Sequence, residues 1–224
     1  MSTGTRARIV GWLLLGLVRL LTGAQARWWG CPPKAEQRIY FANHQSHADL
    51  VMIWAALPEE LRSITRPIAA RDYWANTPVK RWITTEVFNA VYVERAASAP
   101  AEPMADAAGD AVPPADPLAP LAPLIEALRS GDSIIIFPEG TRGHTGEPQK
   151  FKSGLYTLAT MFPEVVLVPA WIDNVQRVMP KGEIVPVPIL CSVTLGAPMR
   201  VEPGEERRPF LDRARAAVIA LRDV

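Results

Sequence analysis

The sequence is poor in the residues that most often bind metals or form covalent bridges. Among 224 residues it has two cysteines, Cys31 and Cys191, and three histidines. The cysteines match no zinc-ligand spacing and fit a reduced compartment, although two cysteines could also pair with each other. The net charge is only +1, without the basic excess of a nucleic-acid-binding protein. We therefore expect no metal site and no nucleic-acid partner.

Acidic residues are absent before Glu36, and the apolar run in this region is too short to span a membrane. Residues 9–21 form that run of 13 residues, which Arg19 interrupts, whereas a spanning helix needs about 20 residues. Trp28 and Trp29 follow, and tryptophan favours membrane interfaces. We expect residues 1–30 to form a membrane-associating helix in the interface, with its arginines at the lipid headgroups.

Two other interpretations of this segment remain open. A basic start, a short apolar core and the triplet Ala24-Gln25-Ala26 are also typical of a cleaved signal peptide, although Arg19 interrupts the core. Alternatively, the helix packs on the surface of its own domain, where its apolar stripe would be buried.

Short apolar runs alternate with helical patterns over most of the remaining chain. Residues 133–137 (SIIIF) and 165–172 (VVLVPAWI) have the continuous apolar character of buried parallel strands. Further strands are expected at 38–42, 66–70 and 87–94, and helices at 47–57, 121–130, 152–162 and 209–222. This alternation predicts one α/β domain over residues 31–224, with a mostly parallel sheet flanked by helices.

One segment departs from this alternation. Residues 96–123 contain seven prolines, eleven alanines and four acidic residues, with no lysine or arginine. Such a composition cannot build a packed core, so it predicts a disordered Ala/Pro-rich surface insertion.

All three histidines lie in two short polar segments, of which the first is Asn-His-Gln-Ser-His-Ala-Asp at 43–49. It lies between a predicted strand and a predicted helix, where α/β folds place their sites. On one regular helix His44 and Asp49 would point about 140° apart, so they can meet only if His44 lies on the turn. Asp49 could then accept from one ring nitrogen and leave the other free as a base. The alternative is an N-cap cluster, in which Asn43 or Ser46 caps the helix.

The second polar segment, residues 137–146, also follows a predicted buried strand. Three glycines, Thr141 and Arg142 would let backbone N–H groups and a guanidinium approach an anion closely. The alternative is an ordinary polar turn. Because both segments end predicted strands, a base with its orienting acid and an anion site can face one edge of the sheet.

Together the two segments resemble the motifs of the glycerolipid acyltransferase family, which includes 1-acyl-glycerol-3-phosphate acyltransferase. The family's first motif is Asn-His, four residues and Asp, which Asn43, His44 and Asp49 match. Its third motif, Phe-Pro-Glu-Gly-Thr-Arg, is matched at all six positions from 137 to 142. This pair of motifs is highly specific.

Weaker matches follow in the order of the family's motifs. Residues 89–95 match Gly-x-x-Phe-Ile-Asp-Arg loosely, with Asn89 in place of the glycine. Residues 152–154 match a Lys-x-Gly, and residues 168–169 match an apolar strand with Val-Pro. Arg71 stands where relatives often carry a lysine that has been proposed to contact phosphate.

The resemblance implies an acyltransferase of phospholipid biosynthesis. A fatty acyl group would pass from acyl-CoA or acyl-carrier protein to the free hydroxyl of 1-acyl-glycerol 3-phosphate. His44 would be the catalytic base and Asp49 would orient it, while Asn43, Ser46 or a backbone N–H would stabilise the oxyanion. The acceptor's phosphate would be held by Glu139, Gly140, Thr141, Arg142, Arg95 and Arg71.

No cofactor or metal is implied, because a thioester is already activated. The expected partners are the lipid acceptor, the acyl carrier and the membrane surface. The expected location is the cytoplasmic face of the inner (plasma) membrane, with the protein peripheral or monotopic.

Three alternatives remain beside this interpretation. The acceptor could be another lysolipid, such as a lyso-ornithine lipid, or glycerol 3-phosphate. A thioesterase or lipase-like hydrolase is disfavoured because the sequence has no G-x-S-x-G elbow. A non-catalytic membrane-binding homologue is disfavoured because His44 and Asp49 are both present.

Overall fold

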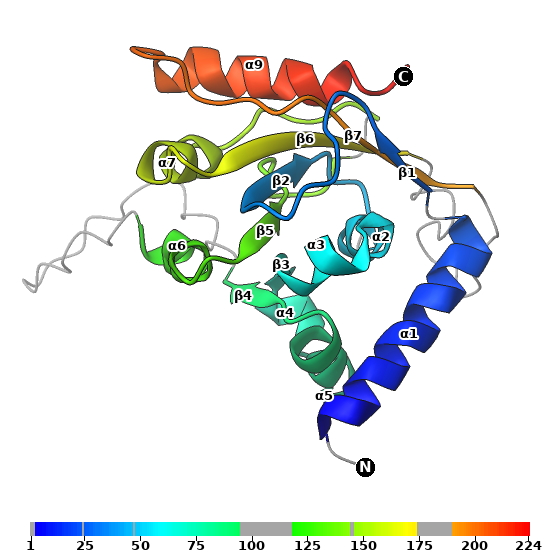
Figure 1. Cartoon of the computed structure of the whole chain (residues 1–224). Coiled ribbons are helices and arrows are strands. Elements are labelled where there is room, and N and C mark those ends of the chain that lie inside the picture. The colour runs from blue at the N-terminus through cyan, green and yellow to red at the C-terminus, as the bar shows by residue number, and fades with distance from the viewer. Residues whose placement is uncertain (1–2, 24, 47, 95–117, 144–145, 174–189) are drawn as a thin grey trace, which may run out of the picture.

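A mixed sheet organises the part of the chain that the structure describes. The computed structural model describes residues 3–23, 25–46, 48–94, 118–143, 146–173 and 190–224 (Figure 1). Its strands are β1 (Gln25–Trp28), β2 (Arg38–Ala42), β3 (Thr65–Ala70), β4 (Val91–Val93), β5 (Ser133–Ile136), β6 (Val166–Asp173) and β7 (Ser192–Leu195). Its helices are α1 (Thr3–Thr22), α2 (Asp49–Ala56), α3 (Glu59–Ser63), α4 (Arg71–Trp74), α5 (Pro78–Trp82), α6 (Ala122–Arg129), α7 (Gly154–Met161) and α9 (Arg207–Ile219), with a π-helical turn η1 (Ile83–Val87) and a 3-10 turn η2 (Ala119–Leu121).

The strand order is β1-β7-β6-β2-β5-β3-β4. Neighbouring strands from β6 to β4 run parallel, as do β1 and β7, and only the β6–β7 pairing is antiparallel. Helices cover both faces of the sheet (Figure 1). The expectation of a single α/β domain with a mostly parallel sheet is therefore confirmed.

Strand β2 lies in the middle of the sheet because both of its faces are apolar. All five of its residues are buried. Ile39 and Phe41 pack in a cluster with α6, α7 and α9, whereas Tyr40 and Ala42 pack in the opposite cluster with α2. Alternate side chains of a strand point to opposite faces, so this strand supplies both layers of the core at once.

Two short strands, β1 and β7, were not predicted from the sequence. Strand β7 pairs with β6, and β1 pairs with β7 at the sheet's edge. Residues 25–28 thus belong to the sheet, although the sequence analysis assigns them to the membrane-associating segment. Each strand has only four residues, and unlike the equally short β5 each mixes polar with apolar side chains, so no apolar run marks it.

The predicted insertion ends earlier than residue 123. Residues 118–123 contain η2 and the start of α6, while 95–117 lie outside the described residues. A proline stands in the first turn of both helices, where it is compatible with a helix because its missing N–H would have no partner there. The proline-rich composition of the segment therefore extends into η2 and the first turn of α6, so composition alone placed the end of the insertion too late.

The N-terminal helix α1 has two different faces. Leu14, Leu15 and Val18 pack against the core cluster that contains α2. The opposite face exposes large apolar side chains: Ile9, Trp12, Leu13, Leu17 and Leu20. No described helix has the length and apolarity that a membrane crossing requires. Packing on the domain's own surface, one of the alternatives above, thus accounts for one face of the helix and leaves the other uncovered.

Both cysteines are buried thiols outside any disulfide, so they do not pair with each other, which was one possibility that the sequence left open. Burial raises the pKa of the Cys31 thiol, and it raises the pKa of Cys191 to about 11. Both thiols therefore stay uncharged near neutral pH, whereas a cysteine that acts as a nucleophile or metal ligand does so as a thiolate.

The departure from glycine at residue 89 has a conformational explanation. Strand β4 begins at Val91 rather than at 87 because residues 83–87 form the π-helical turn η1. Asn89 lies in the turn between them with φ of +49°. Asparagine is, after glycine, among the residues that best tolerate this left-handed region, so it preserves the backbone that a glycine would adopt.

We expect Asn89→Gly to leave the free energy of unfolding nearly unchanged and Asn89→Val to lower it by about 1–2 kcal/mol, because a β-branched residue is strained at positive φ. Urea unfolding of the two variants beside the parent protein measures the difference. Equal stability of the Val and Gly variants would contradict the conformational explanation.

Candidate active site

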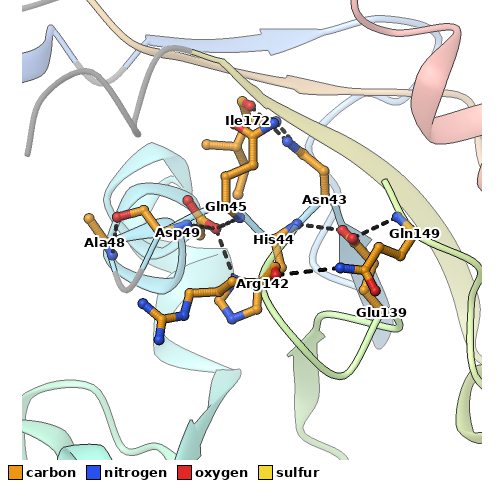
Figure 2. Close-up of polar contacts among 10 residues, drawn as sticks. Asn43, His44, Gln45, Ala48, Asp49, Glu139, Arg142, Gln149 and Ile172 are labelled. Carbon is orange, nitrogen blue, oxygen red and sulfur yellow. Dashed lines mark hydrogen bonds and ion pairs between the residues drawn. The ribbon is translucent and has the colours of Figure 1, made fainter. Parts of the chain in front are cut away.

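The two polar segments meet at the carboxyl edge of the parallel strands. Strands β2 and β5 are parallel neighbours, so the residues that follow them emerge at the same edge. The backbone N–H of His44 donates to Oε1 of Glu139 at 2.7 Å, and the N–H of Gly143 donates to the carbonyl of His44 at 2.8 Å. The expectation that both segments face one edge of the sheet is confirmed (Figure 2).

One carboxylate oxygen of Asp49 organises the first segment. Its Oδ2 lies 2.9 Å from Nδ1 of His44, and it accepts the backbone N–H groups of Gln45 at 2.6 Å and Ser46 at 2.8 Å (Figure 2). The Asp49 side chain is buried and begins α2, where the helix dipole favours a negative charge. His44 lies on the turn and Asp49 on the helix, the arrangement that their spacing requires.

These contacts decide between the two sequence interpretations of residues 43–49. The N-cap residue of α2 is Ala48, and no side chain caps the helix. Ser46 Oγ instead accepts the N–H of Ala48 at 3.2 Å. The segment is thus built around the Asp49 carboxylate, and the predicted N-cap cluster is absent.

The His44 ring has a defined orientation and tautomer. Because a carboxylate can only accept hydrogen bonds, Nδ1 must carry the proton that it shares with Asp49. The other ring nitrogen, Nε2, is then left with a lone pair. The ring stacks on Phe137, with centroids 4.4 Å apart and planes inclined by 17°. His44 therefore presents an oriented base, and it lines a cavity.

Asn43 joins two strands and does not point at the reacting groups. It is buried, its Nδ2 donates to the Ile172 carbonyl at 3.0 Å, and its Oδ1 accepts the Ile172 N–H at 2.8 Å. The side chain thereby ties the end of β2 to β6. Asn43 is buried and does not line the cavity beside His44, so its amide is not placed to supply the oxyanion donor that was one expectation.

Glu139 stabilises the backbone of the site through two hydrogen bonds. It is 2 % exposed, and its two oxygens accept the N–H groups of His44 and Gln149, each at 2.7 Å. Burial raises the pKa of Glu139, against the lowering effect of the two N–H donors. The side chain does not line the cavity, contrary to the expectation that it holds the acceptor's phosphate. An anionic carboxylate would also repel a phosphate.

A cavity of about 500 Å³ opens beside His44. Much of its wall is apolar and comes from β3, β5, α6 and α7, with Ile68, Ile136, Leu124, Leu155 and Leu158. Its polar lining includes His44, Glu94, Thr141, Arg142 and Lys152. The cavity thus combines an oriented base, two cations, one carboxylate and an apolar wall.

The predicted phosphate-binding residues are only partly brought together. Gly140, Thr141 and Arg142 line the cavity, as expected. Arg71 follows β3 at the same edge, where its Nε lies 4.0 Å from Glu94 and its guanidinium lies over Tyr92, but it does not line the cavity. Arg95 lies outside the described residues.

Lys152 lines the cavity, although the motifs predict no role for it beyond a Lys-x-Gly match. Its backbone N–H donates to the Pro138 carbonyl at 2.8 Å, which places it beside the turn at 137–140. The match itself was the available signal, but a sequence does not show which side chain reaches a cavity.

We expect Glu139→Gln to lower the free energy of unfolding by about 1–3 kcal/mol, because an amide nitrogen would face one of the two backbone N–H donors and leave it unsatisfied. Urea unfolding measures the loss. Glu147→Gln is the matched control, since Glu147 forms partly exposed ion pairs at 3.7–3.8 Å with Arg222 and Arg215, and such pairs contribute little. Equal losses in the two variants would contradict this stabilising role.

Comparison with known proteins finds acyltransferases. The family model "Acyltransferase" matches residues 32–173. A mouse 1-acyl-sn-glycerol-3-phosphate acyltransferase alpha is 27% identical over 154 residues, which are 67% of this chain and 45% of the mouse protein. The chloroplastic 1-acyl-sn-glycerol-3-phosphate acyltransferase LPAT1 of Arabidopsis thaliana is 38% identical over 58 residues, 26% of this chain and 16% of that protein. The matched regions thus span less than half of either relative.

A solved structure shares the fold. The crystal structure of PlsC, the 1-acyl-sn-glycerophosphate acyltransferase from Thermotoga maritima, superposes with a TM-score of 0.65 at 21% identity, over 97% of this chain and 80% of PlsC. The family model covers well over half of the chain and includes both polar segments. The chain therefore belongs to the acyltransferase family, as the resemblance of its motifs to glycerolipid acyltransferases implied.

Proposed function

We propose that the protein is an O-acyltransferase that moves a fatty acyl group from a thioester carrier to the free hydroxyl of 1-acyl-glycerol 3-phosphate. One observation carries the proposal: the oriented His44–Asp49 pair, at 2.9 Å, lies beside a cavity that has both an apolar wall and two cations. The relatives named above, which bear this activity in their names, support the choice of acceptor.

The geometry supports direct transfer without an acyl-enzyme intermediate. Nε2 of His44 takes the proton of the acceptor hydroxyl as its oxygen attacks the thioester carbonyl carbon. The carbon–sulfur bond then breaks, and the departing sulfur receives the proton from the imidazolium. Asp49 stabilises the imidazolium while it exists. The two cysteines are buried and uncharged, so neither serves as the nucleophile.

The cavity supports an amphiphilic substrate. Apolar side chains from four elements line it next to His44, and burying an acyl chain against them would contribute roughly 0.8 kcal/mol per methylene. Arg142 and Lys152 supply positive charge for a phosphate. In this proposal Arg142 binds the acceptor's phosphate with Gly140 and Thr141, and Arg95 and Arg71 remain candidates for assisting it.

The exposed face of α1 supports attachment to a membrane surface. Trp12 is 73% exposed and Leu20 is 81% exposed, and with Ile9, Leu13 and Leu17 they form one apolar stripe. Arg6 and Arg8, also exposed, lie near the start of the same helix. This combination suits an interfacial helix on anionic lipid. We propose that the protein acts as a peripheral or monotopic enzyme on the cytoplasmic face of the inner (plasma) membrane.

The signal-peptide alternative fits the fold less well. Cleavage after Ala26 would divide β1, whose four residues pair with β7. It would also remove α1 from the core residues that it covers. Mass spectrometry of the intact protein distinguishes the two: an N-terminus near Arg27 would overturn the membrane anchor.

An assay with both donors and several acceptors tests the proposal. Purified protein is supplied with acyl-CoA or acyl-carrier protein and with 1-acyl-glycerol 3-phosphate, other lysolipids, glycerol 3-phosphate or water alone. The proposal expects the fastest ester formation with 1-acyl-glycerol 3-phosphate. Thioester hydrolysis without any acceptor would indicate a hydrolase, and the absence of any reaction would indicate a non-catalytic homologue.

The His44–Asp49 pair predicts that substitutions of its two residues lower turnover to different degrees. His44→Ala should abolish detectable transfer because the base is gone, whereas Asp49→Asn should lower kcat by about 100-fold or more, because an amide no longer enforces the Nδ1–H tautomer. Steady-state kinetics with a circular dichroism spectrum of each variant separates chemistry from misfolding. A folded His44→Ala protein with turnover near that of the parent would refute the mechanism.

The apolar stripe predicts vesicle binding through α1. Leu13→Glu with Leu17→Glu should weaken binding to anionic phospholipid vesicles by about 100-fold, since each buried leucine contributes about 1.5–3 kcal/mol. Vesicle sedimentation measures the partition. Met161→Glu is the control, because Met161 is an exposed apolar residue on α7, away from α1. Unchanged binding of the double variant would contradict the anchor.

A further inference from the structure

Two cations of the cavity have no anionic partner among the residues that the structure describes. Arg142 and Lys152 both line the cavity, and neither forms an ion pair or a side-chain hydrogen bond from its charged group to any described residue. Two arginines on and after α9 do have partners: Arg215 lies 3.8 Å and Arg222 3.7 Å from Glu147. Unpaired cations that share a cavity indicate an anionic ligand.

The backbone turn at 137–140 directs Lys152 toward this cavity. Gly140 has φ of +70°, and a Cβ placed there would lie 2.7 Å from Nζ, 2.8 Å from Cε and 2.9 Å from Cδ of Lys152. The lysine chain therefore runs along the bare backbone of the turn. A side chain at residue 140 would be strained at this φ and would displace the ammonium group. Gly140 thus serves the site by leaving room for Lys152.

Lys150 provides a contrast within the same segment. It is exposed, like Lys152, but it does not line the cavity. Two lysines that are two residues apart therefore differ in one respect that matters here, which is contact with the cavity. Any general effect of positive charge on this surface would be shared by both.

We propose that Lys152 is a specificity-determining residue that, with Arg142, selects an acceptor carrying a phosphate monoester. This inference rests on the proposed function and deepens it. A phosphate monoester carries a charge of about −1.5 to −2 near pH 7, whereas a phosphodiester carries a single negative charge. Glu94, the carboxylate in the cavity lining, lies 4.0 Å from Arg71, which can balance its charge. Arg142 and Lys152 then match the monoester, and with a diester one of them would have no full counter-charge. The site thereby discriminates 1-acyl-glycerol 3-phosphate from lysophospholipids with an esterified headgroup.

Another phosphate monoester could in principle occupy the site, because coenzyme A carries one on its ribose. The experiment therefore needs separate donor and acceptor arms. Acyl-carrier protein delivers the same acyl group through a phosphodiester and lacks the ribose phosphate. An effect of Lys152 on the acceptor should persist with this donor, whereas an effect on coenzyme A should vanish.

The test compares Lys152→Gln, Lys152→Arg and Lys150→Gln with the parent protein. For each, kcat and KM are measured for 1-acyl-glycerol 3-phosphate and for lysophosphatidylglycerol, with both donors. We expect Lys152→Gln to raise the KM for the monoester by about tenfold or more, because it loses a charge-assisted hydrogen bond present in both ground and transition states. The kcat and the KM for the diester should change by less than about threefold. Lys152→Arg should restore most of the affinity, and Lys150→Gln should behave as the parent.

Several results would overturn the inference. An unchanged KM for the monoester in Lys152→Gln would do so, as would equal rises for monoester and diester. A rise confined to the KM of acyl-CoA would assign Lys152 to the donor's phosphate instead. None of these results would contradict the proposed function. The proposed function fails separately, if the parent protein acylates no lysolipid.

Discussion

The site depends on a single oxygen atom, Oδ2 of Asp49. It holds the His44 ring at 2.9 Å while it accepts two backbone N–H groups of the turn between them. These hydrogen bonds and the stacking of the ring on Phe137 fix where the base stands. The carboxylate can occupy its buried position because it begins α2, where the helix dipole and unpaired N–H groups favour a negative charge.

Two further buried side chains hold the same turn from other directions. Asn43 joins it to β6 through Ile172, and Glu139 joins it to the loop that follows β5. That loop is in turn fastened to α9, where Arg215 donates to the Pro148 carbonyl at 2.8 Å. A buried polar group is costly unless its hydrogen bonds are made, so the three side chains constrain the geometry strongly. Residues distant in sequence thereby converge on the position of one imidazole.

The sequence predicts most of this architecture because its parallel strands are short, apolar and clearly bounded. Residues 38–42 and 133–137 were recognisable as strands, and parallel strands bring their following residues to one edge. The His44–Asp49 pairing follows from that placement and from the spacing of the two residues. The edge strand β1 and its neighbour β7 could not be predicted, since their four residues mix polar with apolar side chains and form no apolar run like that of β5.

The sequence shows the type of each residue near the site, but it does not show in which direction the side chain points. A motif names Glu139 and Asn43 as polar residues near the site, but only the fold turns both of them away from the cavity and toward backbone groups. For the same reason the sequence could not show that the Lys152 side chain reaches the cavity, because this contact depends on the backbone of Gly140. Asn89 is a related case, because its exchange for glycine becomes intelligible only once its φ of +49° is known.

The tautomer of His44 tests the account most directly. Nitrogen-15 NMR of the ring in protein labelled at histidine distinguishes a protonated nitrogen from one with a lone pair, and His44→Gln identifies the resonances. With the imidazole neutral, we expect the proton on Nδ1, shared with Asp49, and a lone pair on Nε2. A neutral ring with its proton on Nε2 would contradict the account, because Asp49 could then neither orient the ring nor leave a base facing the cavity.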